Sequence, residues 1–202
     1  MAEFVTADLM AAYEALLAAG DLTCAVSDVL GHSAAMHADM RPVWPGARLL
    51  GPAVTVRPLG TDLSAVYAGI EAAPRGSVLV IDAHGLRHSA FWGERTTRAA
   101  LERGLRGAVI DGACRDVTAV TRLGFPVFST AITPNAGVRG GQGAVQVPGA
   151  PAGTPVLPGD LVLADENGVV VVPRGEEERT LRAVQAALSA EQAAIQQESA
   201  HE

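Results

Sequence analysis

Short apolar strands alternate with helical segments through the middle of this chain, and the alternation constrains its fold more than any other feature. Residues 77–82 (SVLVID) form a continuous apolar run between turn residues, which is typical of a buried strand. We predict strands at residues 53–56, 77–82, 107–111 and 126–129, separated by helices at residues 62–72, 95–103 and 117–123. Strands separated by helices indicate an α/β fold with parallel strands.

The two ends of the chain extend this pattern. Residues 6–19 predict a helix with Thr6 as its N-cap and Gly20 just past its end, and a short second helix is expected at residues 25–30. After Ser129 the chain is rich in Gly and Pro, which favours turns and edge strands. A last strand is expected at residues 168–173, followed by a polar helix at residues 176–198. We therefore predict one domain over residues 1–202, a layered α/β/β sandwich rather than a long doubly wound sheet.

Composition and charge exclude several classes of protein. Hydrophobic residues make up 49% of the 202 residues and charged residues 18%, which excludes a disordered chain. The net charge of -7 argues against a nucleic-acid partner, and no apolar run approaches the roughly 18 residues of a membrane span. The first residues carry an early acid and no basic segment, so we expect no signal peptide. Cys24 and Cys114 lie far apart and indicate no disulfide framework, so a cytoplasmic enzyme or regulator is expected.

All 15 basic residues are Arg, because the chain contains no Lys. A lysine Schiff base with a carbonyl substrate, an internal aldimine and a P-loop lysine are therefore excluded. If this protein makes or breaks a carbon–carbon bond next to a carbonyl, a metal and Arg must stabilise the enolate.

Gly93-Glu94-Arg95-Thr96 follows a predicted strand and opens a predicted helix. The first amides of a helix have no acceptors within the helix, and the helix dipole adds partial positive charge, so a carboxylate would bind there. Gly93 would allow a ligand to approach the backbone closely. The alternative is an ordinary helix start with an acidic first turn.

Arg115 and Asp116 follow the next predicted strand, again at the start of a helix. Asp can bind a hard cation such as Mg²⁺ through oxygen, and Arg can hold a carboxylate or a developing enolate oxygen. The alternative is that Asp116 is a plain N-cap and Arg115 a surface residue. Because both segments follow strands, we expect them at the same end of a parallel sheet, where α/β folds bind ligands.

Three further features are weaker candidates. His84 and His88 are expected in a loop that lines the pocket, because Gly85 disfavours a helix between them. Cys114 is expected to be a small buried side chain rather than a nucleophile. Residues 137–143 (GVRGGQG) resemble a glycine-rich nucleotide loop, but they follow no clear strand and open no helix.

Taken together and in order, several short motifs resemble those of the 4-hydroxy-4-methyl-2-oxoglutarate aldolase family, which also includes the regulator of ribonuclease activity A. These motifs are GE at residues 93–94, RD at 115–116, PVF at 126–128, PGD at 158–160 and ADENGVVVVP at 164–173. The resemblance covers roughly residues 51–173. It implies an α/β/β sandwich similar to the swivelling phosphohistidine domain, assembled as a homotrimer or a dimer of trimers.

The resemblance implies a divalent-metal-dependent (class II) pyruvate aldolase that cleaves 4-hydroxy-4-methyl-2-oxoglutarate into two pyruvates and also decarboxylates oxaloacetate. Gly93, Glu94, Arg95 and Thr96 would bind the carboxylate of a small 2-oxo acid. Arg115 would contact its 2-oxo group. Asp116 would anchor Mg²⁺ or Mn²⁺, partly through water, and Glu94 would act on the substrate hydroxyl through water.

Two alternatives stay open beside this reading. Some members of the family bind a protein partner instead, so the chain could be a non-catalytic regulator of a ribonuclease. The same pocket could also act on a different 2-oxo acid. Some family enzymes borrow a C-terminal acid from a neighbouring subunit; Glu191 and Glu198 are candidates here, and no motif selects between them.

Overall fold

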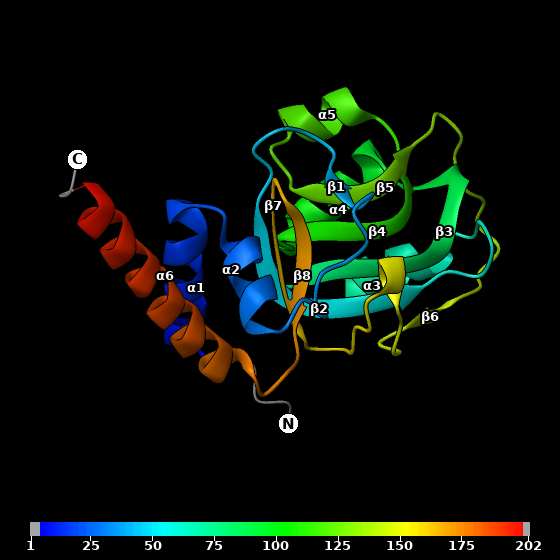
Figure 1. The fold of residues 1–202 in the computed structure, drawn as a ribbon. Coiled ribbons are helices and arrows are strands. Elements are labelled where there is room, and N and C mark those ends of the chain that lie inside the picture. Colours follow the sequence, from blue (N-terminus) through cyan, green and yellow to red (C-terminus); the bar gives the residue numbers. More distant parts are fainter. Residues whose placement is uncertain (1–4, 200–202) are drawn as a thin grey trace.

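The structure, a computed structural model, describes residues 5–199 and is built around a mixed sheet (Figure 1). Its strand order is β1-β5-β4-β3-β2-β7-β8, and β6 pairs with β2 off this path. The parallel part consists of β2 (Leu49–Arg57), β3 (Val78–Trp92), β4 (Gly107–Cys114) and β5 (Val127–Ile132). The expected α/β fold is therefore confirmed, and its strands run parallel because a helix connects each one to the next.

The connecting helices pack against one face of the parallel strands. They are α3 (Ser64–Ala72), α4 (Glu94–Arg103) and α5 (Val117–Arg122). The buried core on this face is made mostly of aliphatic side chains, with Trp92 stacked on Phe125 at a centroid separation of 5.8 Å. The three predicted helices in this region are confirmed, with boundaries that move by one or two residues.

The opposite face of the sheet is covered by the hairpin of β7 (Leu161–Asp165) and β8 (Gly168–Val172). Strand β2 joins the two layers, because Leu49 to Pro52 pair with β7 whereas Ala53 to Val56 pair with β3. A second apolar core fills the space between the layers. Short elements complete the edges: β1 (Arg41–Pro42), β6 (Ala144–Val145) and the 3-10 turn η1 (Pro151–Gly153).

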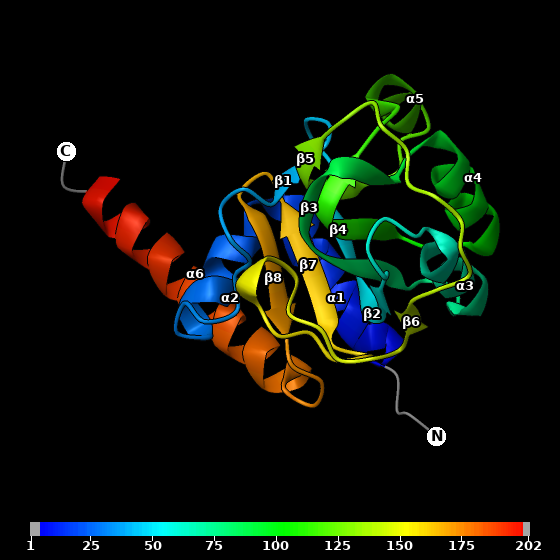
Figure 2. The same cartoon turned by 90° about the vertical axis from the view of Figure 1, so that its right-hand side faces the viewer.

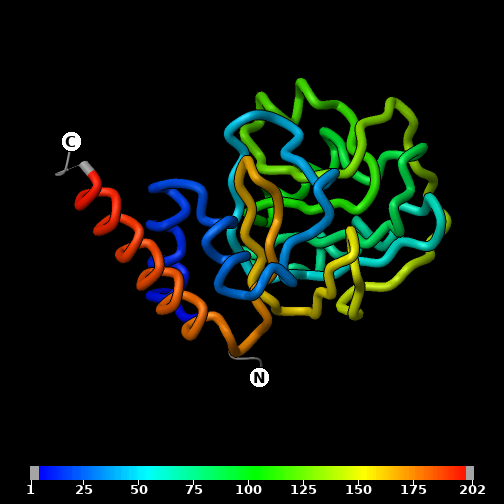
Figure 3. The backbone as a smooth tube through the Cα atoms, viewed as in Figure 1, coloured from blue at the N-terminus to red at the C-terminus, as the bar shows by residue number. Residues whose placement is uncertain are grey.

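A further layer of helices covers the outer face of the β7–β8 hairpin (Figure 2). It consists of α1 (Ala7–Ala19), α2 (Leu22–Val29) and α6 (Glu177–Ser199). The Tyr13 hydroxyl donates to the Glu177 carbonyl at 2.8 Å and so links the two ends of the chain. The backbone trace shows the C-terminal part of α6 extending away from the sheets (Figure 3). The likeness to the swivelling phosphohistidine domain stays a prediction.

Several predicted boundaries are wrong, since β2 begins earlier than expected and β3, β4 and β5 end later. The largest difference has a physical reason. Strand β3 does not end at Asp82 but continues to Trp92, pairing with β4 through three register shifts. His84 and Gly85 adopt positive φ angles of 52° and 68° in this irregular stretch, which are typical of a turn. The sequence therefore predicts the end of the strand here, although the pairing with β4 resumes at Leu86. His84 and His88 therefore lie in a distorted strand and not in a loop. Helix α2 also begins earlier than expected, at Leu22.

Within residues 5–199, no single helix has the length and apolar composition needed to cross a membrane. Helices α1 and α2 reach that length and composition only as a pair, and a bend of 119° separates them. The first four residues, on which the expectation of no signal peptide partly rests, lie outside the described residues.

Candidate active site

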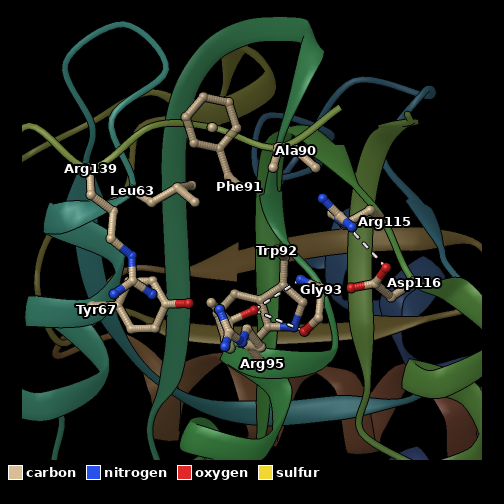
Figure 4. Close-up of a pocket in the computed structure, with 13 residues that line it drawn as sticks. Leu63, Tyr67, Ala90, Phe91, Trp92, Gly93, Arg95, Arg115, Asp116 and Arg139 are labelled. Atoms are coloured by element: carbon tan, nitrogen blue, oxygen red, sulfur yellow. Dashed lines mark hydrogen bonds and ion pairs between the residues drawn. The ribbon is translucent and has the colours of Figure 1, made fainter. Parts of the chain in front are cut away.

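A pocket of about 400 Å³ opens where β3 and β4 end and α4 begins (Figure 4). Five of the residues predicted from the sequence line it: Gly93, Arg95, Thr96, Arg115 and Asp116. The other lining residues are Leu63, Tyr67, Ala90, Phe91, Trp92, Ala136, Gly137 and Arg139. The two segments predicted to meet at one end of the parallel sheet are therefore brought together in one cavity.

The start of α4 is fixed by a network of buried hydroxyl groups. The Thr96 hydroxyl accepts a hydrogen bond from the Gly93 N–H at 2.9 Å. The Trp92 indole donates to the Thr97 hydroxyl at 2.8 Å, and that hydroxyl donates to the Gly93 carbonyl at 2.9 Å. Because Thr96 and Thr97 are almost fully buried, this network holds the first turn of the helix in one orientation.

Two backbone amides of this first turn have no partner. Within the described part of the chain, neither the Arg95 N–H nor the Thr96 N–H meets a hydrogen-bond acceptor. They lie at the positive end of the helix dipole, at residues that line the pocket. This end of the pocket can therefore bind an anionic group such as a carboxylate.

Gly93 is required by the close approach of the next strand end. A Cβ atom at this position would lie 2.7 Å from Oδ2 of Asp116 and 2.8 Å from Cγ of Arg115. Its φ of −173° is ordinary extended backbone, so the space and not the backbone angle demands glycine. Gly93 thus lets the Arg115–Asp116 pair lie directly against the start of α4.

Asp116 occupies the N-cap position of α5 in the left-handed region, with φ 55°, but its side chain does not cap that helix. Its carboxylate accepts hydrogen bonds from the Glu94 N–H of α4 and from Nε of Arg115, both at 3.1 Å. The plain N-cap alternative is therefore wrong: the carboxylate faces the pocket, with its side chain 34% exposed. A non-glycine residue in this conformation is uncommon and costs roughly 1–2 kcal/mol.

Glu94 contributes its backbone to this site, while its carboxylate points elsewhere. The carboxylate forms an ion pair with Arg98 one turn along α4 at 2.6 Å, and Arg122 lies 4.0 Å away. Glu94 is not among the residues that line the pocket. Its role as an acid–base residue stays a prediction, and it would require the side chain to turn away from Arg98.

Arg139 and Tyr67 were not predicted from the sequence. The Arg139 guanidinium lies over the Tyr67 ring, 4.1 Å from its centroid, at the side of the pocket away from Arg115 (Figure 4). The sequence of the glycine-rich segment that carries Arg139 resembles a nucleotide loop, and this resemblance assigns no role to the arginine. An arginine among glycines before an edge strand was the available signal.

Three other candidates, His84, His88 and Cys114, are not among the residues that line the pocket. His84 pairs with Asp82 at 3.3 Å, and its side chain is 62% exposed. Cys114 is fully buried as expected, and burial raises the pKa of its thiol to about 12, so the thiol stays protonated at neutral pH. Over residues 5–199 there is no cluster of three or more His, Cys, Asp or Glu side chains suited to a metal ion.

The chain is similar to known proteins over the part that contains the pocket. A family model described as RraA-like, Aldolase/RraA, matches residues 23–171. A protein of Halalkalibacterium halodurans that carries the provisional name 4-hydroxy-4-methyl-2-oxoglutarate aldolase is 36% identical over 160 residues, which cover 79% of this chain and 76% of that protein.

Two solved structures are similar over most of their length. An uncharacterized protein from Pseudomonas syringae has a TM-score of 0.85 at 29% identity, covering 98% of this chain and 92% of its own. The RNA-processing inhibitor RraA from Thermus thermophilus has a TM-score of 0.69 at 31% identity, covering 76% of this chain and 93% of its own.

Proposed function

Because the chain belongs to the RraA-like family of Aldolase/RraA proteins, we propose that it is a divalent-metal-dependent carbon–carbon lyase. In this proposal it cleaves 4-hydroxy-4-methyl-2-oxoglutarate into two pyruvates and also decarboxylates oxaloacetate. One observation carries the proposal: the two unpartnered amides at the start of α4 belong to residues that line the same pocket as Arg115 and Asp116. A carboxylate binder, a guanidinium and an oxygen ligand in one cavity suit a 2-oxo acid.

The substrate carboxylate is assigned to the N–H groups of Arg95 and Thr96. These amides cost no reorganisation on binding, because the hydroxyl network around Gly93 already fixes the turn. The positive end of the α4 dipole adds favourable electrostatic energy for an anion. The substrate is thereby oriented with its 2-oxo group toward the end of β4.

Arg115 is assigned to the 2-oxo oxygen. Its Nε is held by Asp116, and within residues 5–199 no other hydrogen bond engages the guanidinium, so its terminal nitrogens are available to the pocket. A planar fork of donors can match an oxygen that gains negative charge as a carbon–carbon bond breaks. Arg115 therefore stabilises the enolate without taking or giving a proton.

Asp116 fits a divalent cation as its only protein ligand. Its carboxylate uses two of roughly four acceptor positions on N–H donors, and its side chain is 34% exposed, so acceptor positions remain for a hard cation. Mg²⁺ suits such a site, because it keeps several waters and binds through one or two carboxylates plus the ligand. When bound, the metal would withdraw electrons from the 2-oxo acid. The chain supplies no lysine that could do this instead.

Glu94 is proposed to take the proton of the 4-hydroxyl group through water. The Glu94 N–H already holds Asp116, so a turn of the side chain from Arg98 toward the cavity would leave the backbone contacts unchanged. Proton removal is needed for retro-aldol cleavage but not for loss of carbon dioxide from oxaloacetate. The two reactions therefore make different demands on Glu94.

A regulator of a ribonuclease is the second candidate function. The observation that favours it is the similarity to the RNA-processing inhibitor RraA, together with a net charge of -7 that suits a protein rather than a nucleic-acid partner. Capture of a ribonuclease by the tagged protein, with no pyruvate released from any 2-oxo acid, would favour this candidate over the lyase. A cytoplasmic location is part of either proposal.

The proposed lyase is tested by pyruvate release from 4-hydroxy-4-methyl-2-oxoglutarate and from oxaloacetate, with Mg²⁺ or Mn²⁺ and after exhaustive treatment with a chelator. We expect turnover only with metal. Asp116→Asn should abolish it and leave the protein folded, because Asn tolerates the left-handed conformation as well as Asp does. Asp8→Asn on the exposed face of α1 is the matched control. Full activity after metal removal would contradict the proposal.

A further inference from the structure

The glycine-rich segment 137–143 forms the wall of the pocket that faces away from Asp116. After β5 the chain runs past α4 and α3 before it reaches β6 (Figure 2). Along this path Gly137 and Arg139 line the pocket, and the Arg139 guanidinium stacks on Tyr67 of α3. The only arginine of this segment is thereby held at the rim of the cavity.

A buried carboxylate at the start of α3 clamps the segment. Asp62 is 5% exposed, and its Oδ2 accepts hydrogen bonds from the N–H groups of Gly140 and Gln142, each at 2.9 Å. Its Oδ1 accepts from the Ser64 N–H at 2.8 Å. A Cβ atom at Gly140 would lie 2.8 Å from Oδ2 of Asp62, which explains a glycine there. The segment thus wraps around Asp62, and the amides of Gly140 and Gln142 are not available to a phosphate.

Backbone pairing reinforces this clamp. The Leu63 N–H donates to the Val138 carbonyl at 2.9 Å, and the Val138 N–H donates to the Thr61 carbonyl at 3.0 Å. Hydrogen bonds from the Ser64 hydroxyl and N–H, and then from the amides of Gln142 and Gly140, hold the pKa of Asp62 well below its usual range. The carboxylate therefore stays charged at any pH at which the enzyme would be assayed.

The guanidinium of Arg139 is free to bind an anion. Among the described residues it forms no ion pair and no hydrogen bond, and its one contact of this kind is the face of Tyr67. Arg115, by contrast, is paired with Asp116. A guanidinium with its donors unengaged beside a cavity is a binding group for an anion. Figure 4 shows Arg139 on the side of the pocket away from Arg115. A ligand whose first carboxylate binds the amides at the start of α4 and whose 2-oxo oxygen meets Arg115 would therefore need a second anionic group to engage Arg139.

We propose that Arg139, stacked on Tyr67, binds the second carboxylate of the substrate, and that Asp62 is the positioning residue that holds Arg139 in place. This inference rests on the proposed lyase function, whose substrates are dicarboxylic, and it adds the residue that recognises their distal carboxylate. The first carboxylate binds at the start of α4, and the distal carboxylate selects the ligand on the side of the pocket formed by Arg139 and Tyr67. Monocarboxylic 2-oxo acids fill the first position and leave Arg139 unused.

Binding of two matched ligands tests the assignment without turnover. 2-Oxoglutarate and 2-oxopentanoate have the same number of carbon atoms and differ in the distal carboxylate. Neither has the 4-hydroxyl group that retro-aldol cleavage requires, so neither is cleaved. Calorimetry in the presence of Mg²⁺ should show 2-oxoglutarate binding to the wild type on the order of 10-fold or more tightly, as a charge-assisted hydrogen bond allows. Arg139→Gln should remove this preference and change the affinity for 2-oxopentanoate by less than about threefold.

Three further variants separate charge, geometry and position. Arg179→Gln, on the exposed face of α6, makes the same change of charge far from the pocket and should keep the full preference. Arg139→Lys keeps the positive charge but lacks the planar fork of donors, so it should keep part of the preference for 2-oxoglutarate. Asp62→Asn should reduce the preference for 2-oxoglutarate while 2-oxopentanoate binding and the circular dichroism spectrum stay as in wild type, because a merely structural role would weaken both ligands.

The outcomes distinguish this inference from the function on which it rests. The distal carboxylate site is overturned if the wild type binds the two ligands with equal affinity. It is also overturned if Arg139→Gln lowers the affinity for both ligands by the same factor. Either result counts even if pyruvate is released in the cleavage assay. An unchanged preference in Asp62→Asn overturns its positioning role. If the wild type binds neither ligand and releases no pyruvate from any 2-oxo acid, the proposed function fails and takes this inference with it.

Discussion

At the scale of single residues, Arg115 is the group whose chemistry is hardest to replace. Its guanidinium is oriented by Asp116 at 3.1 Å and presents its remaining donors to the pocket. We expect Arg115→Lys to lower kcat by roughly 10²-fold, because an ammonium group is a point charge and lacks the planar fork of donors assigned to the 2-oxo oxygen. Steady-state kinetics on oxaloacetate measure this, with Arg179→Lys as control. A lysine variant within a factor of two of wild type would mean that Arg115 is structural.

Glu94 separates the two proposed reactions. If it takes the proton of the 4-hydroxyl group, Glu94→Gln should lower aldolase turnover by roughly 10²–10⁴-fold, the usual contribution of general acid–base catalysis. Decarboxylation should fall much less, because it needs no such base and the Glu94 N–H still holds Asp116.

Both rates are to be measured on one purified Glu94→Gln preparation. Equal losses in the two reactions would place Glu94 in metal or substrate binding. No loss in either would leave it as a first-turn acid that pairs with Arg98 on α4.

At the scale of elements, the site depends on how closely the start of α4 approaches the end of β4. Gly93 makes this approach possible, since any Cβ there would overlap Arg115 and Asp116. We expect Gly93→Ala to lower kcat by on the order of 10²-fold or more, because a displacement of about 1 Å in a catalytic group costs that much. The fold should survive, because both displaced groups are partly exposed side chains that can shift.

The matched control for Gly93→Ala is Gly20→Ala. Gly20 also has extended backbone, and no atom lies within 4 Å of its would-be Cβ. Thermal melting of both variants shows whether the fold is retained. Wild-type kinetics in Gly93→Ala would contradict the arrangement of α4 and β4 described here.

At the scale of the whole molecule, the two ends of α6 differ in how they pack against the rest of the chain. Its first turns are anchored in the domain, where Leu181 and Val184 are buried and Tyr13 bonds to Glu177. Leu188 also packs against this cluster, whereas Ile195 further along the helix is 55% exposed. Its C-terminal part extends away from the sheets (Figure 3).

We predict a homotrimer or a dimer of trimers, on the strength of the family resemblance. Light scattering at micromolar protein concentration should give three or six times the mass of the chain, since obligate oligomers persist at such concentrations. A monomer under these conditions would contradict the prediction. Glu191 and Glu198 lie in the C-terminal half of α6. If one of them completes the site of a neighbouring subunit, its Gln variant should lose activity.

The sequence by itself determined the parallel strands, the helices that connect them, and the end of the sheet at which the pocket lies. Residues 77–82 and 107–111 are short, continuous apolar runs, and such runs are typical of strands that a parallel sheet buries on both faces. The pairs Gly93-Glu94 and Arg115-Asp116 each follow a parallel strand, and parallel strands end at the same edge. The pocket at that edge therefore followed from local pattern and connectivity.

Only the tertiary structure decided which side chains face the pocket. Asp116 turns from its own helix to α4, Glu94 turns to Arg98, and Arg139 arrives from a segment that Asp62 fixes against α3. The distorted extension of β3 is a further case, because its pairing with β4 resumes beyond residues with turn-like backbone. Local sequence encodes backbone preference, whereas the direction of a side chain and the meeting of distant segments depend on how the layers pack.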